Sequence, residues 1–467
     1  MTATDPVFEP DFLWGVAAAA YQIEGAVEED GRGRSIWDEF CGRPGVVARG
    51  ETGDVATDHY HRYREDVALM RDLGVGAYRL SVSWPRVQPT GRGVINEPGL
   101  DFYDRLIDEL CAAGIAPAVT LFHWDLPQAL QDNGGWLERD TAARLADYAD
   151  IVGRRLGDRV RMWMPLNEPV VHTLYGHALG VHAPGYQLGF GALQAAHHQL
   201  LGHGLAVQAL RAAGCENIGI ASNHAPVHAA SDAREDALAA DIYDHLVNWT
   251  FADPVLRGTY PTPELAAALA GPVDEDLKTV AQPLDWFGIN YYEPTVIAAP
   301  AARDEGASGV LEVELPPGLP FRPVALDTPD RTDFGWPIVP AGLRDIVRTF
   351  ADRYGEMLPP LYITESGASF HDPDPVDGRV PDRRRIDYHR AHLHALKQAV
   401  DDGVDVRGYF VWSILDNFEW AAGYRERFGL VHVDYRTLER TPKDSYHWYR
   451  DLIAAHRTGQ TVTASRS

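Results

Sequence analysis

The chain of 467 residues carries a formal net charge of −25, with 67 acidic side chains against 42 basic ones. This balance argues against nucleic acid and against an anionic membrane as partners, because phosphate recognition depends on clustered Lys and Arg. The three cysteines, Cys41, Cys111 and Cys215, are odd in number and lack metal-ligand spacing, so we interpret them as small core residues in a reducing compartment.

The first residues, MTATDPVFEPDFLWG, lack the basic start and the apolar core of a signal peptide, and no stretch is long enough to span a bilayer. We therefore expect a cytoplasmic protein. Length alone would suggest about three domains. No linker divides the chain, however, and we interpret the Pro- and Gly-rich segment 299–333 as a long functional loop. We predict one domain over residues 1–467, with an ordered barrel from roughly 8 to 455.

Eight short apolar runs alternate with amphipathic segments along the chain. In segments such as 58–73, 100–113 and 141–156, apolar residues recur at spacings of three and four, which indicates helices. Eight strand and helix pairs predict an α/β fold, a (β/α)₈ TIM barrel with long βα loops, since doubly wound sheets more often stop at five or six strands. The runs cover residues 12–22, 77–84, 116–124, 159–168, 217–224, 285–292, 360–367 and 407–416.

Seven of these runs end in a side chain that can bond or polarise a ligand. The carboxyl ends of barrel strands are where such enzymes hold their substrates. The remaining run carries Arg79 inside an otherwise apolar strand, which is costly unless an anion lies opposite. The terminal side chains are Gln22, His123, Asn167 with Glu168, Asn223, Asn290 with Tyr292, Glu365 and Trp412.

Glu168 closes the fourth run, in the stretch MWMPLNEP, where Pro169 ends the strand because it has no N–H to donate. Taken alone, Glu168 could equally be a solvated acid at the start of a loop. Glu365 closes the seventh run, and strands four and seven face each other across the mouth of a closed barrel. Two opposed carboxyl groups are the minimum equipment for cleaving a glycosidic bond.

The surroundings of the two acids predict different roles. Arg79 and Tyr292 are plausible neighbours of Glu365, and they would keep it ionised as a nucleophile. Glu168 follows an apolar run beside an uncharged amide, so desolvation favours its protonated form, as a general acid requires. This chemistry uses no cofactor.

We also expect no metal site. Five histidines could suggest one, but they lack matching acids or cysteines at ligand spacing. We interpret them as residues on helix faces or in packing positions: His59, His61, His197, His198 and His203.

With these residues in place, the chain resembles glycoside hydrolase family 1, the β-glucosidase family, along nearly its whole length. FLWGVAAAAYQIEGA followed by GRGRSIWDEF is similar to the family's amino-terminal signature. FHWDLPQAL, NEP, GINYY, ITESG and VWSILDNFEWAAGYRERFGLVHVDY then follow in the family's order. Six motifs in order are far more specific than any one of them.

The resemblance implies a role for each matching residue. Glu168 would be the acid/base and Glu365 the nucleophile, supported by Arg79, Asn290 and Tyr292. Trp412 would form the floor under the glycone, the sugar that is transferred, and Trp336 the platform for the aglycone, the leaving group. Val170 and Asn223 would also line the aglycone side. The glycone would be held by Gln22, His123, Asn167, Tyr292, Glu419 and Trp420.

Four positions depart from the family pattern: Ser366 after the nucleophile, Pro165 before NEP, Val170 after it, and Glu293 after NYY. The family has Asn, Thr, Trp and Thr or Ser at these places. Because no catalytic group is lost, the departures concern aglycone preference and turnover more than the type of reaction.

We predict a retaining, exo-acting β-glycosidase, foremost a β-glucosidase, that also accepts β-galactosyl or β-fucosyl groups. Its substrates would be small β-glycosides such as cellobiose, and it could be a monomer or a homo-oligomer. A 6-phospho-β-glycosidase is disfavoured, since Glu419 would repel a phosphate at O6. A non-catalytic sugar-binding barrel and net transglycosylation stay open as alternatives.

Overall fold

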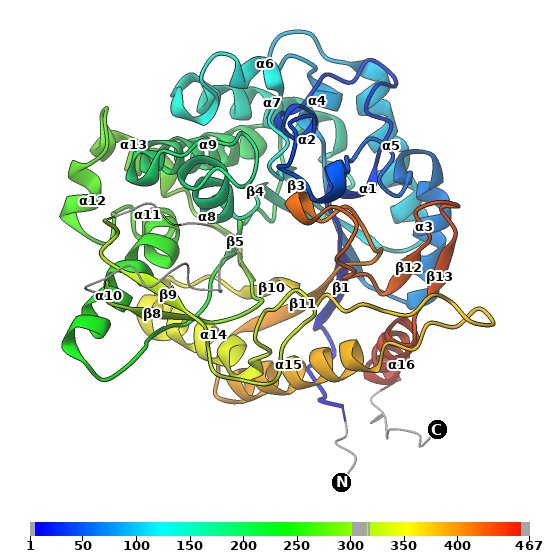
Figure 1. The fold of residues 1–467 in the computed structure, drawn as a ribbon. Coiled ribbons are helices and arrows are strands. Elements are labelled where there is room, and N and C mark those ends of the chain that lie inside the picture. Colours follow the sequence, from blue (N-terminus) through cyan, green and yellow to red (C-terminus); the bar gives the residue numbers. More distant parts are fainter. Residues whose placement is uncertain (1–4, 301–314, 316–317, 459–467) are drawn as a thin grey trace.

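The eight apolar runs form eight parallel strands of one barrel in the computed structural model (Figure 1), which describes residues 5–300, 315 and 318–458. The predicted barrel is therefore confirmed. Each strand is buried on both faces, as a sheet covered by helices requires. The strands are β1 (Leu13–Ala17), β2 (Ala77–Ser81), β3 (Ala116–Phe122), β4 (Met162–Leu166), β5 (Ala221–Asn223), β7 (Phe287–Asn290), β10 (Leu361–Ser366) and β11 (Val406–Trp412).

The sheet closes on itself. Its strand order is β4-β3-β2-β1-β11-β10-β7-β5, so the first strand pairs with the last. In that pair Leu13 lies opposite Gly408 and Ala17 lies opposite Trp412. Parallel bridges from Trp163 to Ile218 and from Asn167 to Ala221 connect β4 to the β5 segment. Closure brings the carboxyl ends of all eight strands to one mouth.

Helices surround the strands (Figure 1) and cover the predicted segments. In α7, Leu145, Tyr148, Val152 and Leu156 are buried at spacings of three and four, which turns one face toward the strands. The longer helices are α3 (His59–Leu73), α5 (Glu97–Ala112), α7 (Asp140–Leu156), α9 (Leu193–Ala212), α10 (Arg234–Asp244), α14 (Pro340–Tyr354), α15 (Arg383–Asp401) and α16 (Asp444–Thr458).

Shorter helices lie in the segments that connect the strands and the longer helices. They are α1 (Ala20–Ile23), α2 (Ile36–Cys41), α4 (Trp84–Val87), α6 (Gln128–Gln131), α8 (Pro169–Val171), α11 (Thr250–Arg257), α12 (Pro263–Ala267) and α13 (Val273–Val280). A π-helical turn, His172–Ala178, follows α8 directly. The chain after β4 therefore stays helical from the residue next to Glu168 onward.

Two small sheets are built into the βα loops. β6 (Val227–Ala229) pairs in parallel with β8 (Thr295–Ala298), which pairs antiparallel with β9 (Arg322–Val324). β12 (Val431–Val433) and β13 (Arg440–Pro442) form an antiparallel pair. Of the loop predicted over 299–333, residues 301–314 and 316–317 lie outside the described residues, and the described part contains β9.

A buried charge cluster anchors the loop after β11. The Lys443 Nζ lies 2.7 Å from a carboxylate oxygen of Asp416 and 2.6 Å from one of Asp372, and an Arg427 nitrogen lies 2.7 Å from Asp416. Burial by itself raises the pKa of Asp416, but the charges of Lys443 and Arg427 outweigh it and lower the pKa to about 2. This loop is therefore fixed to the C-terminal part of the chain.

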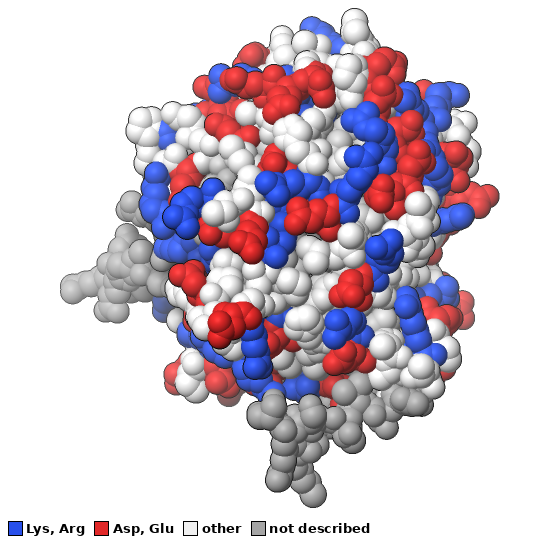
Figure 2. Space-filling model, turned by 90° about the vertical axis from the view of Figure 1, so that its right-hand side faces the viewer, with Lys and Arg blue, Asp and Glu red and all other residues white. Residues whose placement is uncertain are grey.

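The surface mixes charges of both signs. On the face shown in Figure 2, Lys and Arg side chains are interspersed with Asp and Glu. Ion pairs of this kind also join helices, as between Arg155 of α7 and Asp104 of α5, 3.2 Å apart. Within the described part of the chain, no helix has both the length and the apolar character needed to cross a membrane.

The three thiols are free, and they differ in exposure. Cys41 and Cys215 are buried, as predicted for small core residues. Cys111 is exposed, so its prediction as a core residue was wrong. It occupies the last turn of α5, where the helix face turns away from the barrel.

Candidate active site

Glu365 stands at the end of β10 with one cation and one phenol beside it. The Arg79 Nη1 lies 2.5 Å from its Oε1, and the Tyr292 hydroxyl donates to its Oε2 at 2.6 Å. Arg79 and Glu365 are 1% and 3% exposed, so each neutralises a charge that burial would otherwise make costly. The anion that the sequence required opposite Arg79 is Glu365.

Asn167 connects this pair to the neighbouring strands. Its Oδ1 accepts from Arg79 at 2.5 Å and from Asn290 at 3.1 Å, which fixes the orientation of the amide. Its Nδ2 therefore donates to the His123 Nε2, 3.1 Å away. Burial, followed by the charge of Arg79, lowers the pKa of His123, so the ring is neutral and its proton is assigned to Nδ1.

Glu168 stands at the end of β4, and its side chain has only uncharged hydrogen-bond partners. Its Oε1 accepts from the Asn290 Nδ2 at 2.8 Å and from the Asn223 Nδ2 at 3.4 Å. Burial, followed by the negative charge of Glu365, raises the pKa of Glu168 to about 8. A carboxyl in these surroundings can hold a proton at neutral pH.

The two acids therefore share one site and differ in their partners. Asn290 contacts Glu168 and also lies opposite Glu365 in the register of β7 and β10. Glu365 is paired with a cation, whereas Glu168 has only amides. Such a difference lets one group act as a carboxylate while its neighbour acts as a carboxylic acid.

A third carboxyl, Glu419, faces the same mouth from the loop after β11. Gln22 donates to its Oε2 at 3.3 Å and to the Phe418 carbonyl at 2.9 Å. Burial, followed by the charges of Glu426, Glu365 and Glu168, raises the pKa of Glu419 to about 8. The Gln22 Oε1 is buried with no hydrogen-bond partner among the described residues, so it is available to a ligand hydroxyl.

Flat rings line the site beside these acids. The His123 ring stacks within 5.9 Å of Trp412 and 6.1 Å of Trp420, centroid to centroid. Trp124 lies 4.7 Å from Trp420, and its indole N–H donates to the Asn167 carbonyl. Aromatic faces with polar edges suit the C–H faces and hydroxyls of a pyranose.

The three predicted aglycone residues lie in different surroundings. Trp336 packs 5.4 Å from the Tyr292 ring, and Asn223 contacts Glu168. Val170 is 6% exposed and belongs to the main hydrophobic core, so its side chain contributes packing behind the site.

Several side chains that contact the site were quoted within motifs and yet not singled out. Trp124 holds the Asn167 carbonyl, the Met164 sulfur accepts from Arg79 at 3.2 Å, and the Thr364 hydroxyl donates to Asn290 at 2.6 Å. Their positions one to three residues from predicted site residues were a usable signal. Nothing in the sequence, however, placed Glu426 beside Glu419.

Strained backbone concentrates at the same place. Glu168, Trp124 and Trp420 have φ of 43°, 76° and 46°, in the left-handed region that side chains with a Cβ avoid. Each such conformation costs on the order of 1 kcal/mol, and the surrounding contacts must offset it.

The five histidines stand apart from this site, on α3 and α9. Among the described residues, no group of three or more His, Cys, Asp or Glu side chains is arranged to hold a metal ion. His203 is buried, and neither of its ring nitrogens has a partner there. Each of the others has a hydrogen-bond partner: His59 bonds to Asp66, His61 to Asp58, His197 to Asp276 and His198 to the Trp136 carbonyl.

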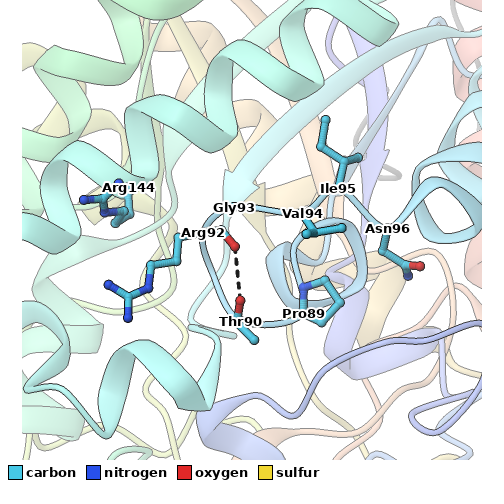
Figure 3. Close-up of a pocket in the computed structure, with 8 residues that line it drawn as sticks. All are labelled: Pro89, Thr90, Arg92, Gly93, Val94, Ile95, Asn96 and Arg144. Atoms are coloured by element: carbon cyan, nitrogen blue, oxygen red, sulfur yellow. Dashed lines mark hydrogen bonds between the residues drawn. The ribbon is translucent and has the colours of Figure 1, made fainter.

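A separate hollow of about 740 Å³ lies on the outer helical layer, beside the segment 89–96 (Figure 3). None of the candidate site residues lines it. Arg144 of α7, on its rim, already pairs with Asp140 at 2.9 Å, and Val94 is 84% exposed. The hollow is therefore distinct from the mouth of the barrel.

Comparison with known proteins agrees with this geometry. A curated β-glucosidase A of Acetivibrio thermocellus is 44% identical over 96% of this chain and 98% of its own. A bifunctional β-D-glucosidase/β-D-fucosidase of Bifidobacterium breve is 45% identical over 96% and 99%. A solved family 1 β-glucosidase of Thermotoga maritima, in complex with isofagomine lactam, is 42% identical, covers 97% of this chain and 100% of its own, and has a TM-score of 0.89.

The sequence model described as glycosyl hydrolase family 1 matches residues 4–458. Nearly the whole chain is thus covered, in agreement with the motifs and with the barrel. The chain belongs to glycosyl hydrolase family 1.

Proposed function

We propose that this protein is a retaining, exo-acting β-glucosidase in which Glu365 is the nucleophile and Glu168 the acid/base. The observation that carries the proposal is the unequal pair of carboxyl groups at one mouth. Glu365 is held by Arg79 and Tyr292, and Glu168 has only amide partners and a raised pKa. This is the combination that double displacement needs.

In the proposed reaction, Glu365 attacks the anomeric carbon while Glu168 gives its proton to the leaving oxygen. Glu168, now a carboxylate, takes a proton from water, which displaces Glu365 from the same carbon. Asn167 would bond the 2-hydroxyl, because its amide is oriented by Arg79, His123 and Asn290 and such contacts strengthen in the transition state.

The glycone would be an unphosphorylated sugar. Gln22 and Glu419 would hold vicinal hydroxyls, with Trp420 and Trp412 against the ring. Glu419 has no ion-pair partner within the described ranges, and Glu426 beside it already pairs with Arg425 at 2.8 Å. No free cation is therefore offered to a phosphate at O6 by these side chains, which disfavours a 6-phospho-β-glycosidase. Cellobiose and a cytoplasmic location remain predictions.

The test is a set of rates on p-nitrophenyl β-D-glucoside, β-D-galactoside, β-D-fucoside and β-D-glucoside 6-phosphate. We expect release from the unphosphorylated sugars, with glucoside or fucoside fastest, and proton NMR should show β-glucose as the first anomer formed. Release only from the phosphate ester would favour the phospho-glycosidase. No release from any substrate would favour a sugar-binding barrel.

The pH profile follows from the protonation of Glu168. Its pKa is raised, so the proton that the first step requires is present below about pH 8 and is lost as the pH rises through that value. We expect kcat/KM for the glucoside to fall on the alkaline side with an apparent pKa near 8, a value that belongs to the coupled pair. A profile flat to pH 10 would contradict this assignment.

A further inference from the structure

Glu293 is a charged residue beside the proposed site that the catalytic steps do not use. It directly follows Tyr292, whose hydroxyl donates to Glu365, and it leads into β8, where the Thr295 N–H donates to the Pro226 carbonyl at 3.0 Å. Its side chain is partly exposed. Trp336, the proposed aglycone platform, packs against the same Tyr292 ring.

The neighbours of Glu293 place it on the leaving-group side of the mouth. Burial, followed by the charges of Tyr243, Glu293 and Glu168, raises the pKa of Tyr175. The backbone gives the location: Thr295, two residues after Glu293, lies opposite Val227 in the pairing of β8 with β6. The segment that carries Val227 follows Asn223, whose amide contacts Glu168. Tyr175 belongs to the π-helical turn His172–Ala178, which follows Glu168 in the chain. Burial also raises the pKa of Tyr243 to about 12, and Glu293 contributes.

Glu293 has no counter-charge of its own. In the ranges 5–300 and 318–458 it makes no hydrogen bond or ion pair, and its pKa is raised to about 8 by burial, with only Arg331 acting against this. The Arg331 guanidinium is engaged elsewhere, since it donates to the carbonyls of Gly335 and Leu326. With so little positive charge nearby, the Glu293 carboxylate can be stabilised by a cation that a ligand brings.

We propose that Glu293 is a specificity-determining residue of the aglycone site, which selects β-glucosides whose leaving group carries a protonated amine. The substrate class is a glucosyl group linked to an amino sugar or to another amine-bearing alcohol. This inference rests on the proposed function, because it assumes that Glu168 and Glu365 cleave the bond.

The physical reason is charge compensation. An ammonium group on the aglycone supplies the cation that Glu293 lacks, and in a partly desolvated cleft this attraction is several times stronger than in water. A neutral hydroxyl at the same place gains only an ordinary hydrogen bond.

The experiment compares glucose release from 4-(aminomethyl)phenyl and 4-(hydroxymethyl)phenyl β-D-glucoside. The ratio of the two kcat/KM values is measured in the wild type and in Glu293→Gln. Since both enzymes see the same two leaving groups, intrinsic reactivity cancels in the comparison. We expect the ratio, amine over alcohol, to fall roughly tenfold in the variant, the scale of one partly screened charge pair.

Asp330→Asn is the matched control. Asp330 is exposed on the loop that carries Trp336, and its side chain makes no hydrogen bond or ion pair in the described structure, so this variant removes one negative charge without altering the site. Its ratio should equal that of the wild type. Glu293→Thr removes the carboxyl with a smaller side chain and provides the same test if Glu293→Gln folds poorly.

The outcomes separate the inference from the proposed function. An unchanged ratio in both Glu293 variants, with both substrates cleaved, overturns the selection of amines and leaves the glucosidase intact. An equal fall in Asp330→Asn also overturns it, because the effect would then be general charge. No glucose from either substrate in the wild type overturns the proposed function itself.

Discussion

Glu365→Gln should lower kcat on p-nitrophenyl β-D-glucoside by about 10⁴-fold or more, the scale that loss of a covalent nucleophile has in other hydrolases. The amide cannot attack the anomeric carbon, although it has nearly the same shape. It leaves Arg79 buried without a counter-ion, so a lower melting temperature is also expected. Rates should therefore be measured well below the unfolding transition, with the fold checked by circular dichroism.

Glu365→Asp separates two roles of Glu365: its charge, which stabilises Arg79, and its position, which allows attack on the anomeric carbon. It keeps a carboxylate for Arg79 but withdraws it by one methylene, so stability should be largely retained while kcat still falls steeply. Glu356→Gln, at an exposed position in the 3₁₀ turn after α14, should behave as the wild type. Turnover by Glu365→Gln within tenfold of the wild type would remove Glu365 from the reaction.

Glu168→Gly should lower kcat by roughly 10²- to 10⁴-fold, the range of a lost general acid/base. The loss should be smallest in the first step for 2,4-dinitrophenyl β-D-glucoside, whose leaving group needs no proton. Azide should then restore turnover, because it fits the space left by the side chain and attacks the glycosyl-enzyme without base assistance. The product should be β-glucosyl azide.

Glu365→Gly is the matched comparison, since it opens the opposite face of the sugar. Azide there should attack in place of the nucleophile and give α-glucosyl azide. Opposite product anomers from the two variants would identify both acids at once. A folded Glu168→Gly that azide does not rescue would contradict the role of Glu168 as acid/base.

The barrel was predictable because its signal is repeated eight times. Each strand is buried on both faces, so its sequence is a run of apolar residues. The polar residues that end these runs all lie at the carboxyl end of the barrel. Arg79 was equally informative, since a guanidinium inside an apolar strand demands an anion, and Glu365 was the available one at a strand end.

Other features depend on contacts between distant loops, which periodicity does not encode. β6, β8 and β9 are short strands that pair only because the barrel brings their loops together, and they were not predicted. The charge of Glu426 acts on Glu419 through space, and the isolation of Glu293 depends on where Arg331 points. Cys111 was misplaced because its helix turns one face outward in the last turn.

The pairing of β1 with β11 cannot form until the chain is almost completely translated. Leu13 leaves the ribosome early, but its partner Gly408 is made near the end of the chain. At ~5–20 residues per second, one edge of β1 waits roughly 20–80 s for its neighbour. Until then the nascent chain presents an open strand edge that other chains could join. Premature termination before β11 should therefore yield insoluble fragments. These fragments should have no activity, because β11 and Glu419 are translated last.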